Sequence, residues 1–89
     1  MDKVLLVIPA YNEEKNIEKV VDHLVRDFPE LDYVVVNDGS RDRTARICRE
    51  NGYNLLDLSV NLGLAGCFQA GMKYAYQKGY RYAIQFDGD

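Results

Sequence analysis

Four short apolar runs alternate along the chain with three longer stretches in which apolar residues recur at helical spacing. The runs cover residues 3–8, 31–37, 54–58 and 80–86, and they are nearly continuous, as in strands buried on both faces of a parallel sheet. In the first helical stretch, 16–28, the apolar residues fall on a single face, and Pro29 ends it. Further helices are predicted over 41–51, with Ser40 or Asp42 as N-cap, and over 64–78.

This order, βαβαβαβ with short links, predicts an α/β fold. We expect a three-layer, Rossmann-like arrangement with a mostly parallel four-stranded sheet and helices on both faces. Pro9 should end the first strand. The third helix should turn its larger apolar residues inward, and the tyrosines around its end should serve packing: Phe68, Met72, Ala75 and Tyr76 on the inner face, and Tyr74, Tyr76, Tyr80 and Tyr82 as packing residues.

Size and composition narrow the range of functions. The 89 residues form at most one small domain, and the net charge of −3 with a pI near 5.0 gives no indication of a nucleic-acid surface. The two cysteines are far apart without a CxxC pattern, which favours free thiols in the cytoplasm. There is no signal peptide and no run near the roughly 20 apolar residues of a membrane span, so we expect a cytoplasmic chain. Contact with the inner face of a membrane would come through a part outside these 89 residues.

Polar clusters follow the predicted strands, at the sheet edge where open α/β sheets bind ligands. After the first strand comes PAYNEE, residues 9–14, which lacks the glycines of a dinucleotide or P-loop motif. Tyr11 either offers a flat face to a nucleobase or caps the sheet. Glu13 and Glu14 also suit the first turn of a helix, where the dipole favours carboxylates.

The second and third clusters each allow two readings. Asp38, at the end of the second strand, either binds a donor group such as a ribose hydroxyl or base N–H, or belongs to a simple turn with Gly39. The segment 61–66, NLGLAG, opens the third helix. Its small residues suit a phosphate at the helix N-terminus and close packing on the sheet equally well.

The last cluster, Asp87-Gly88-Asp89, follows the fourth predicted strand directly. Two carboxylates separated by one residue can face one divalent cation, and oxygen ligands suit Mg²⁺ or Mn²⁺, which bind through one or two carboxylates together with substrate phosphates. The pair is a weak signal alone, and the other two clusters make a metal-dependent site more plausible.

Taken in order, these motifs resemble the family 2 glycosyltransferases of the GT-A fold. The resemblance rests on VIPAYNEE at 7–14, NDGS at 37–40 with Asp42 and Thr44, NLG at 61–63, and QFDGD at 85–89, and it covers the whole chain. It implies a nucleotide-sugar donor carrying UDP, GDP or dTDP, bound with Mg²⁺ or Mn²⁺. The residues that it implies for the donor are Pro9, Ala10, Tyr11, Glu13, Asp38, Asn61, Gly63 and Asp87, with Asp38 on the base, and the metal ligands are Asp87 and Asp89.

The resemblance also implies an inverting enzyme of cell-envelope polysaccharide or lipid-linked sugar synthesis. In such enzymes the general base and most of the acceptor site follow the metal motif. Residues 1–89 therefore correspond to the N-terminal, nucleotide-sugar-binding part, truncated after Asp-x-Asp, and we expect no catalytic residue among them. The chief alternative is a non-catalytic nucleotide-binding or receiver-like signalling module. A nucleotidyltransferase is disfavoured, because its glycine-rich first loop is absent.

Such a truncation has a physical consequence. The first and third helices and the fourth strand would keep apolar surface without a partner in the chain. We therefore expect a homo-oligomer.

Overall fold

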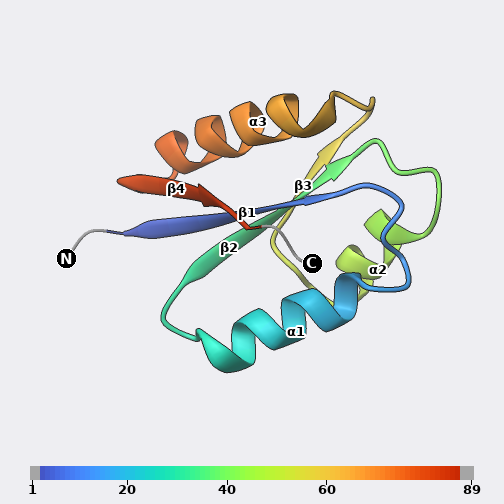
Figure 1. Ribbon diagram of the computed structural model, residues 1–89, viewed down its shortest axis with the longest axis horizontal. Helices are drawn as coiled ribbons and strands as arrows, with labels where there is room; N and C mark the ends of the chain where they lie inside the picture. Colours follow the sequence, from blue (N-terminus) through green and yellow to red (C-terminus); the bar gives the residue numbers. More distant parts are fainter. Residues whose placement is uncertain (1–2, 87–89) are drawn as a thin grey trace.

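The computed structural model describes residues 3–86 and contains seven regular elements (Figure 1). Strands and helices alternate strictly, as the apolar pattern predicts. They are β1 (Val4–Ala10), α1 (Ile17–Asp27), β2 (Asp32–Asp38), α2 (Thr44–Glu50), β3 (Leu55–Leu58), α3 (Gly63–Gln77) and β4 (Tyr82–Gln85).

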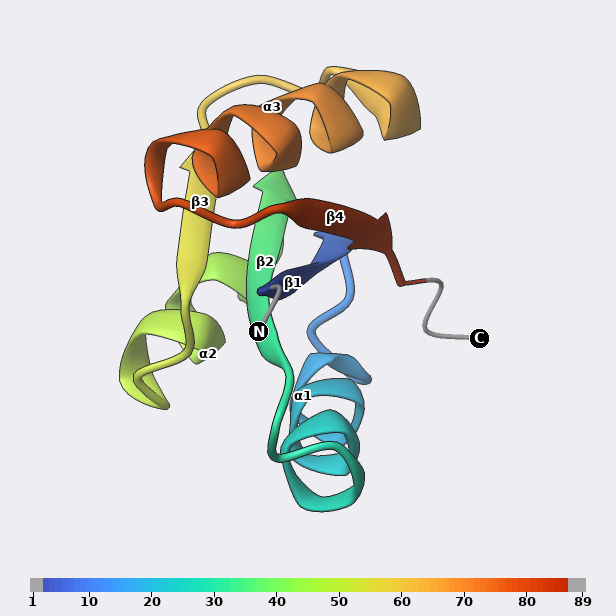
Figure 2. The same cartoon turned by 90° about the vertical axis from the view of Figure 1, so that its left-hand side faces the viewer.

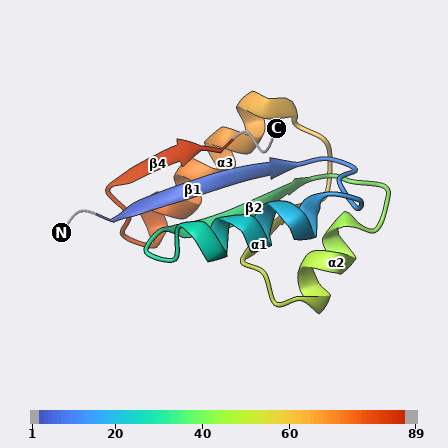
Figure 3. The same cartoon turned by 60° about the horizontal axis from the view of Figure 1, so that its bottom comes forward.

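The four strands form one parallel sheet in the order β3-β2-β1-β4. From β1 the chain moves outward to β2 and β3, then crosses back along α3 to place β4 on the other side of β1. Helices α1 and α2 lie on one face of the sheet and α3 on the other, as Figures 1 and 2 show; in Figure 3, α1 passes in front of β2 while α3 lies behind the strands. The predicted three-layer α/β architecture is confirmed.

Because successive residues of a strand point to opposite faces, β1 and β2 supply two separate cores. Leu6, Ile8 and Val35 pack with buried residues of α1 and with Cys48 of α2. Leu5, Val7 and the two neighbouring valines of β2 pack against α3, where Cys67 and Ala75 are buried. Both cysteines are free and buried, as expected from their spacing.

The structure corrects the prediction that Pro9 ends the first strand. β1 continues in register through Pro9, opposite Val36, to Ala10. The carbonyl of Val7 accepts a hydrogen bond from Phe86, so residue 9, two positions later, faces the same side of the strand. In the described part of the chain no strand lies opposite Pro9 on that side, and its missing N–H costs no sheet hydrogen bond.

The predicted inner face of the third helix is also wrong in part. The buried positions are Cys67, Gly71 and Ala75, whereas Met72 is half exposed and Tyr76 is 86% exposed. A Cβ atom at Gly71 would lie 2.6 Å from a methyl carbon of Val7, so α3 approaches β1 through its small residues. Close packing of the backbones thus turns the larger side chains outward.

The remaining apolar surface divides between packed and exposed side chains. Tyr74 and Tyr80 pack against the α3 side of the core, as predicted, but Tyr82 is 49% exposed. Val25 and Phe28 of the first helical stretch are also exposed, because only Ile17, Val21 and Leu24 reach the core. Within residues 3–86, no helix is both long and apolar enough to cross a membrane.

Candidate functional site: a cavity at the carboxyl ends of β1 and β2

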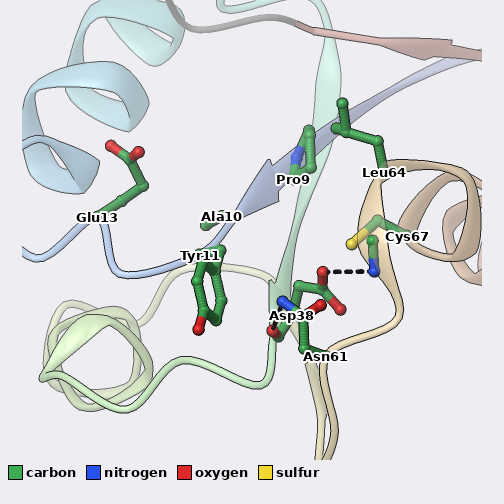
Figure 4. A pocket seen from close by; sticks show the side chains of 9 residues that line it. Pro9, Ala10, Tyr11, Glu13, Asp38, Asn61, Leu64 and Cys67 are labelled. Atoms are coloured by element: carbon green, nitrogen blue, oxygen red, sulfur yellow. Dashed lines mark hydrogen bonds between the residues drawn. The ribbon is translucent and has the colours of Figure 1, made fainter.

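A cavity of about 390 Å³ lies where β1 and β2 end against the first turn of α3 (Figure 4). Every described residue that the sequence singled out for donor binding lines it, together with two that it did not, Leu64 and Cys67. The lining residues are Pro9, Ala10, Tyr11, Glu13, Asp38, Asn61, Gly63, Leu64 and Cys67. Asp87 and Asp89, the predicted metal ligands, lie outside the described residues.

Asp38 joins the end of β2 to the start of α3. Its two carboxylate oxygens accept hydrogen bonds from the backbone N–H groups of Leu62, at 2.6 Å, and Gly63, at 2.9 Å. The amide of Asn61 donates to the backbone carbonyl of Asp38 at 3.2 Å. Asp38 is only 4% exposed, and a carboxylate has about four acceptor positions, so two remain for a ligand.

This arrangement bears on the two readings of segment 61–66. The negative charge of Asp38 already satisfies the N–H groups of Leu62 and Gly63, which a phosphate would otherwise use. A phosphate at the same place would also face that carboxylate. The geometry therefore favours a structural role for this turn, while Asn61 and Gly63 still form part of the cavity wall.

The loop after β2 approaches this turn closely. A Cβ atom at Gly39 would lie 2.6 Å from the backbone nitrogen of Asn61 and 2.7 Å from the carbonyl carbon of Val60. Gly39 also has a φ of 66°, in the left-handed region. Only glycine fits here without moving the backbone, and the close approach lets Asp38 reach α3.

The loop after β1 is held by the loop after β2. Asn12 has a φ of 53°, which reverses the chain just after Tyr11. Its backbone N–H donates to Oγ of Ser40 at 2.9 Å, and its side-chain oxygen accepts from the backbone N–H of Arg41 at 2.9 Å. Asn12 therefore bonds reciprocally to the second loop, and these bonds fix the backbone that carries Tyr11.

A second brace lies one turn further along. The backbone N–H of Glu13 donates to the Thr44 hydroxyl at 2.8 Å, and that of Glu14 donates to Asp42 at 3.2 Å. Burial alone would raise the pKa of Asp42, but hydrogen bonds from the side chain and backbone of Thr44 and from Glu14 outweigh it and lower the pKa. Asp42 accepts the N–H of Thr44, where α2 begins, so it acts as the predicted cap, while Ser40 binds Asn12 instead.

Cys67 forms the inner wall of the cavity, beside Asp38 (Figure 4). Burial, the charge of Asp38 and hydrogen bonding to it together raise the pKa of the Cys67 thiol to about 11. The thiol is therefore a neutral, unreactive wall at physiological pH. The spacing of Cys67, Gly71 and Ala75, four residues apart, is the signal that could have placed it toward the sheet.

Across residues 3–86, no group of three or more His, Cys, Asp or Glu side chains is arranged to hold a metal ion. The metal expectation accordingly rests on Asp87 and Asp89. If these bind a cation at the end of β4, it would lie beside β1, which pairs directly with β4.

Comparison with known proteins decides the family. The profile of glycosyl transferase family 2 matches residues 5–89. The chain belongs to this family.

Curated relatives agree with the family assignment. An uncharacterized protein of Methanocaldococcus jannaschii is 40% identical, over 97% of this chain and 40% of its own length. A UDP-N-acetylglucosamine–dolichyl-phosphate N-acetylglucosaminyltransferase of Methanococcus voltae is 35% identical, over 99% of this chain and 42% of its own. An undecaprenyl-phosphate mannosyltransferase of Micrococcus luteus is 30% identical, over 98% and 38%. The family 2 chain described here thus spans about two fifths of the length of these relatives.

Proposed function

We propose that this chain provides the nucleotide-sugar-binding part of a metal-dependent glycosyltransferase. The observation that carries the proposal is the cavity in which Tyr11, Asp38 and the start of α3 converge at the carboxyl ends of β1 and β2. Open α/β sheets bind nucleotides at this edge. The membership in glycosyl transferase family 2 supports a donor made of a sugar and a nucleoside diphosphate.

The lining side chains suit a nucleoside. Tyr11 is 45% exposed and presents an aromatic ring on which a base can stack. Asp38 keeps free acceptor positions for a base N–H, and the backbone bonds from Leu62 and Gly63 hold its carboxylate in place. Pro9, Ala10 and Leu64 add apolar wall. This donor set favours a base with an imino N–H, as in UDP, GDP and dTDP.

Asp87 and Asp89 are the residues that would hold Mg²⁺ or Mn²⁺. The chemistry of the pair fits, because both cations prefer hard oxygen ligands and bind through one or two carboxylates plus substrate phosphates. When bound, such a cation neutralises the charge that develops on the diphosphate as the sugar leaves. The carboxylates of this chain would orient the diphosphate so that the nucleoside stays in the cavity.

The acceptor of the whole protein is proposed to be a lipid phosphate or a growing polysaccharide. Two relatives carry names that specify undecaprenyl phosphate and dolichyl phosphate, and another is named a poly-beta-1,6-N-acetyl-D-glucosamine synthase. The first class is favoured here because both of its members match at 30% identity or more. The general base would come from sequence after residue 89, as in the family resemblance.

Calorimetric titration tests donor binding directly. UDP, GDP and dTDP are titrated into the chain with and without Mn²⁺, and we expect one of them to bind, more tightly with the metal. Tyr11→Ala should weaken that binding, whereas Tyr76→Ala, at an exposed position of α3, should not. A chain that binds none of the three nucleotides in either condition would refute the proposal.

A further inference from the structure

The hydroxyl of Ser40 connects the loop after β1 to the interior of the sheet. It accepts a hydrogen bond from the backbone N–H of Asn12 at 2.9 Å and donates one to the side-chain oxygen of Asn37. Asn37 is a residue of β2 with 2% exposure, and its amide donates to Asp57 of β3 at 2.7 Å. Asp57 in turn pairs with Arg49 of α2. One exposed loop is thereby tied to three regular elements.

The conformation of Asn12 makes this connection necessary. A non-glycine residue with a φ of 53° lies in the left-handed region, which is sparsely populated and persists only where surrounding contacts hold it. The two contacts that hold Asn12 both come from the loop after β2: the Ser40 hydroxyl and the Arg41 backbone N–H. Asparagine tolerates this region better than most residues, and its side chain supplies one of the two bonds.

Tyr11 depends on this turn. Its side chain is 45% exposed, so burial does little to fix it, and the direction of its ring follows from the backbone at residues 11 and 12. Figure 4 shows the ring beside Asp38 at the mouth of the cavity. Loss of the Ser40 hydroxyl would leave the Asn12 N–H without its partner and allow Tyr11 to leave this position.

We infer that Ser40 is a positioning residue for nucleotide binding, which it supports by fixing the Asn12 turn and so the ring of Tyr11. The inference rests on the proposed function and adds a residue that does not line the cavity. Thr44, which braces Glu13 in the same way, is fully buried and its substitution would disturb the core; Ser40 is only half-buried and can be tested separately.

A double-mutant cycle between Ser40 and Tyr11 tests this role, with UDP, GDP and dTDP as probes in calorimetry. Loss of one hydrogen bond should make Ser40→Ala bind roughly three- to tenfold more weakly than the parent chain. Because Ser40 acts through Tyr11, the double variant Ser40→Ala/Tyr11→Ala should bind no more weakly than Tyr11→Ala alone. Ser40→Thr, which keeps the hydroxyl, should recover most of the affinity.

Amide hydrogen exchange gives a second readout that needs no ligand. The Asn12 N–H should exchange faster in Ser40→Ala, while Ser59→Ala, at an exposed serine after β3, should change neither the exchange nor the affinity. Additive losses in the cycle, or an unchanged affinity of Ser40→Ala, would overturn the inference while nucleotide binding by the parent stands. A parent chain that binds none of the nucleotides would overturn the proposed function and this inference together.

Discussion

The carboxylate of Asp38 lies 2.9 Å from the backbone N–H of Gly63, and this hydrogen bond joins the end of β2 to the first turn of α3. The same carboxylate accepts from Leu62, so one side chain closes the cavity wall and caps a helix. A carboxylate at a helix N-terminus is stabilised by the helix dipole. Asp38 therefore has a structural role that holds its remaining acceptor positions toward the cavity.

Asp38→Asn should weaken nucleotide binding even without metal. The variant loses a charge-assisted hydrogen bond, which corresponds to about 1.5–3 kcal/mol, or roughly a ten- to hundredfold change in Kd. Titration of UDP, GDP and dTDP in the presence of a chelator measures the effect. Asp27→Asn, at the exposed end of α1, serves as the matched control and should bind like the parent. If Asp38→Asn also binds like the parent, Asp38 acts only as a cap.

Asp89→Ala should abolish the contribution of the metal and leave the fold intact. Mg²⁺ and Mn²⁺ give up their water reluctantly and need the diphosphate to complete their coordination, so metal and nucleotide should bind together, with neither tight alone. The measurement compares nucleotide affinity with and without Mn²⁺ in the parent and the variant, and circular dichroism checks the fold. A gain in affinity from Mn²⁺ that persists in Asp89→Ala would contradict the assignment of Asp89 as a ligand.

Sequence patterns predicted the order of elements well, because continuous apolar runs and a single helical face depend on local spacing. They failed where tertiary packing decides. The inner face of α3 follows from the contact between Gly71 and Val7, which no hydrophobic pattern contains. Pro9 stays in β1 because of its position beyond the end of β4, a relationship between segments far apart in the chain.

The cavity residues were predictable for a related reason. They lie directly after strands, and parallel strands bring their carboxyl ends to one edge. The support behind them was not predictable, because Ser40 binds a residue 28 positions away, and Asp38 binds one 25 positions away. Such bonds depend on the exact approach of two loops, which Gly39 permits and the sequence alone does not display.

Gly71→Ala should destabilise the fold although alanine favours helices. The added methyl group would lie 2.6 and 2.7 Å from the two methyl carbons of Val7 in the central strand. Overpacking of this kind costs about 1–3 kcal/mol, more than the roughly 1 kcal/mol that helix propensity returns. Urea denaturation measures the free energy of unfolding. The clash explanation requires Val7→Ala to cost less in the Gly71→Ala background than in the parent; equal costs would contradict it.

Self-association of the 89-residue chain stays a prediction. Leu64, Met72 and Tyr76 project from one face of α3 with exposures of 63%, 49% and 86%, and Phe68 lies between them on the same face. We expect concentration-dependent association in the micromolar range by sedimentation velocity, because an apolar strip of this kind is unfavourable in water. Substituting Met72 and Tyr76 by Gln should weaken it, whereas Val60→Gln, on a loop, should not. A stable monomer at these concentrations would refute the prediction.

Cys67 provides a chemical probe of the cavity. Its pKa of about 11 keeps the thiol protonated at neutral pH, and because thiolate is the reactive form, alkylation by iodoacetamide should be slow at pH 7. The rate should rise with pH toward 11. Bound nucleotide should slow it further, since Cys67 lines the cavity that the nucleotide would fill.

The contribution of Asp38 to this pKa gives the decisive comparison. After burial, the charge of Asp38 and its hydrogen bond to the thiol are the causes that raise the pKa. Asp38→Asn should therefore lower the pKa of Cys67 and speed alkylation at pH 8, measured by mass spectrometry of the peptide that contains residue 67. Cys48, whose raised pKa has burial and Asp57 as its causes, is the internal control and should react at an unchanged rate. Equal acceleration at both thiols would indicate general loosening of the fold instead.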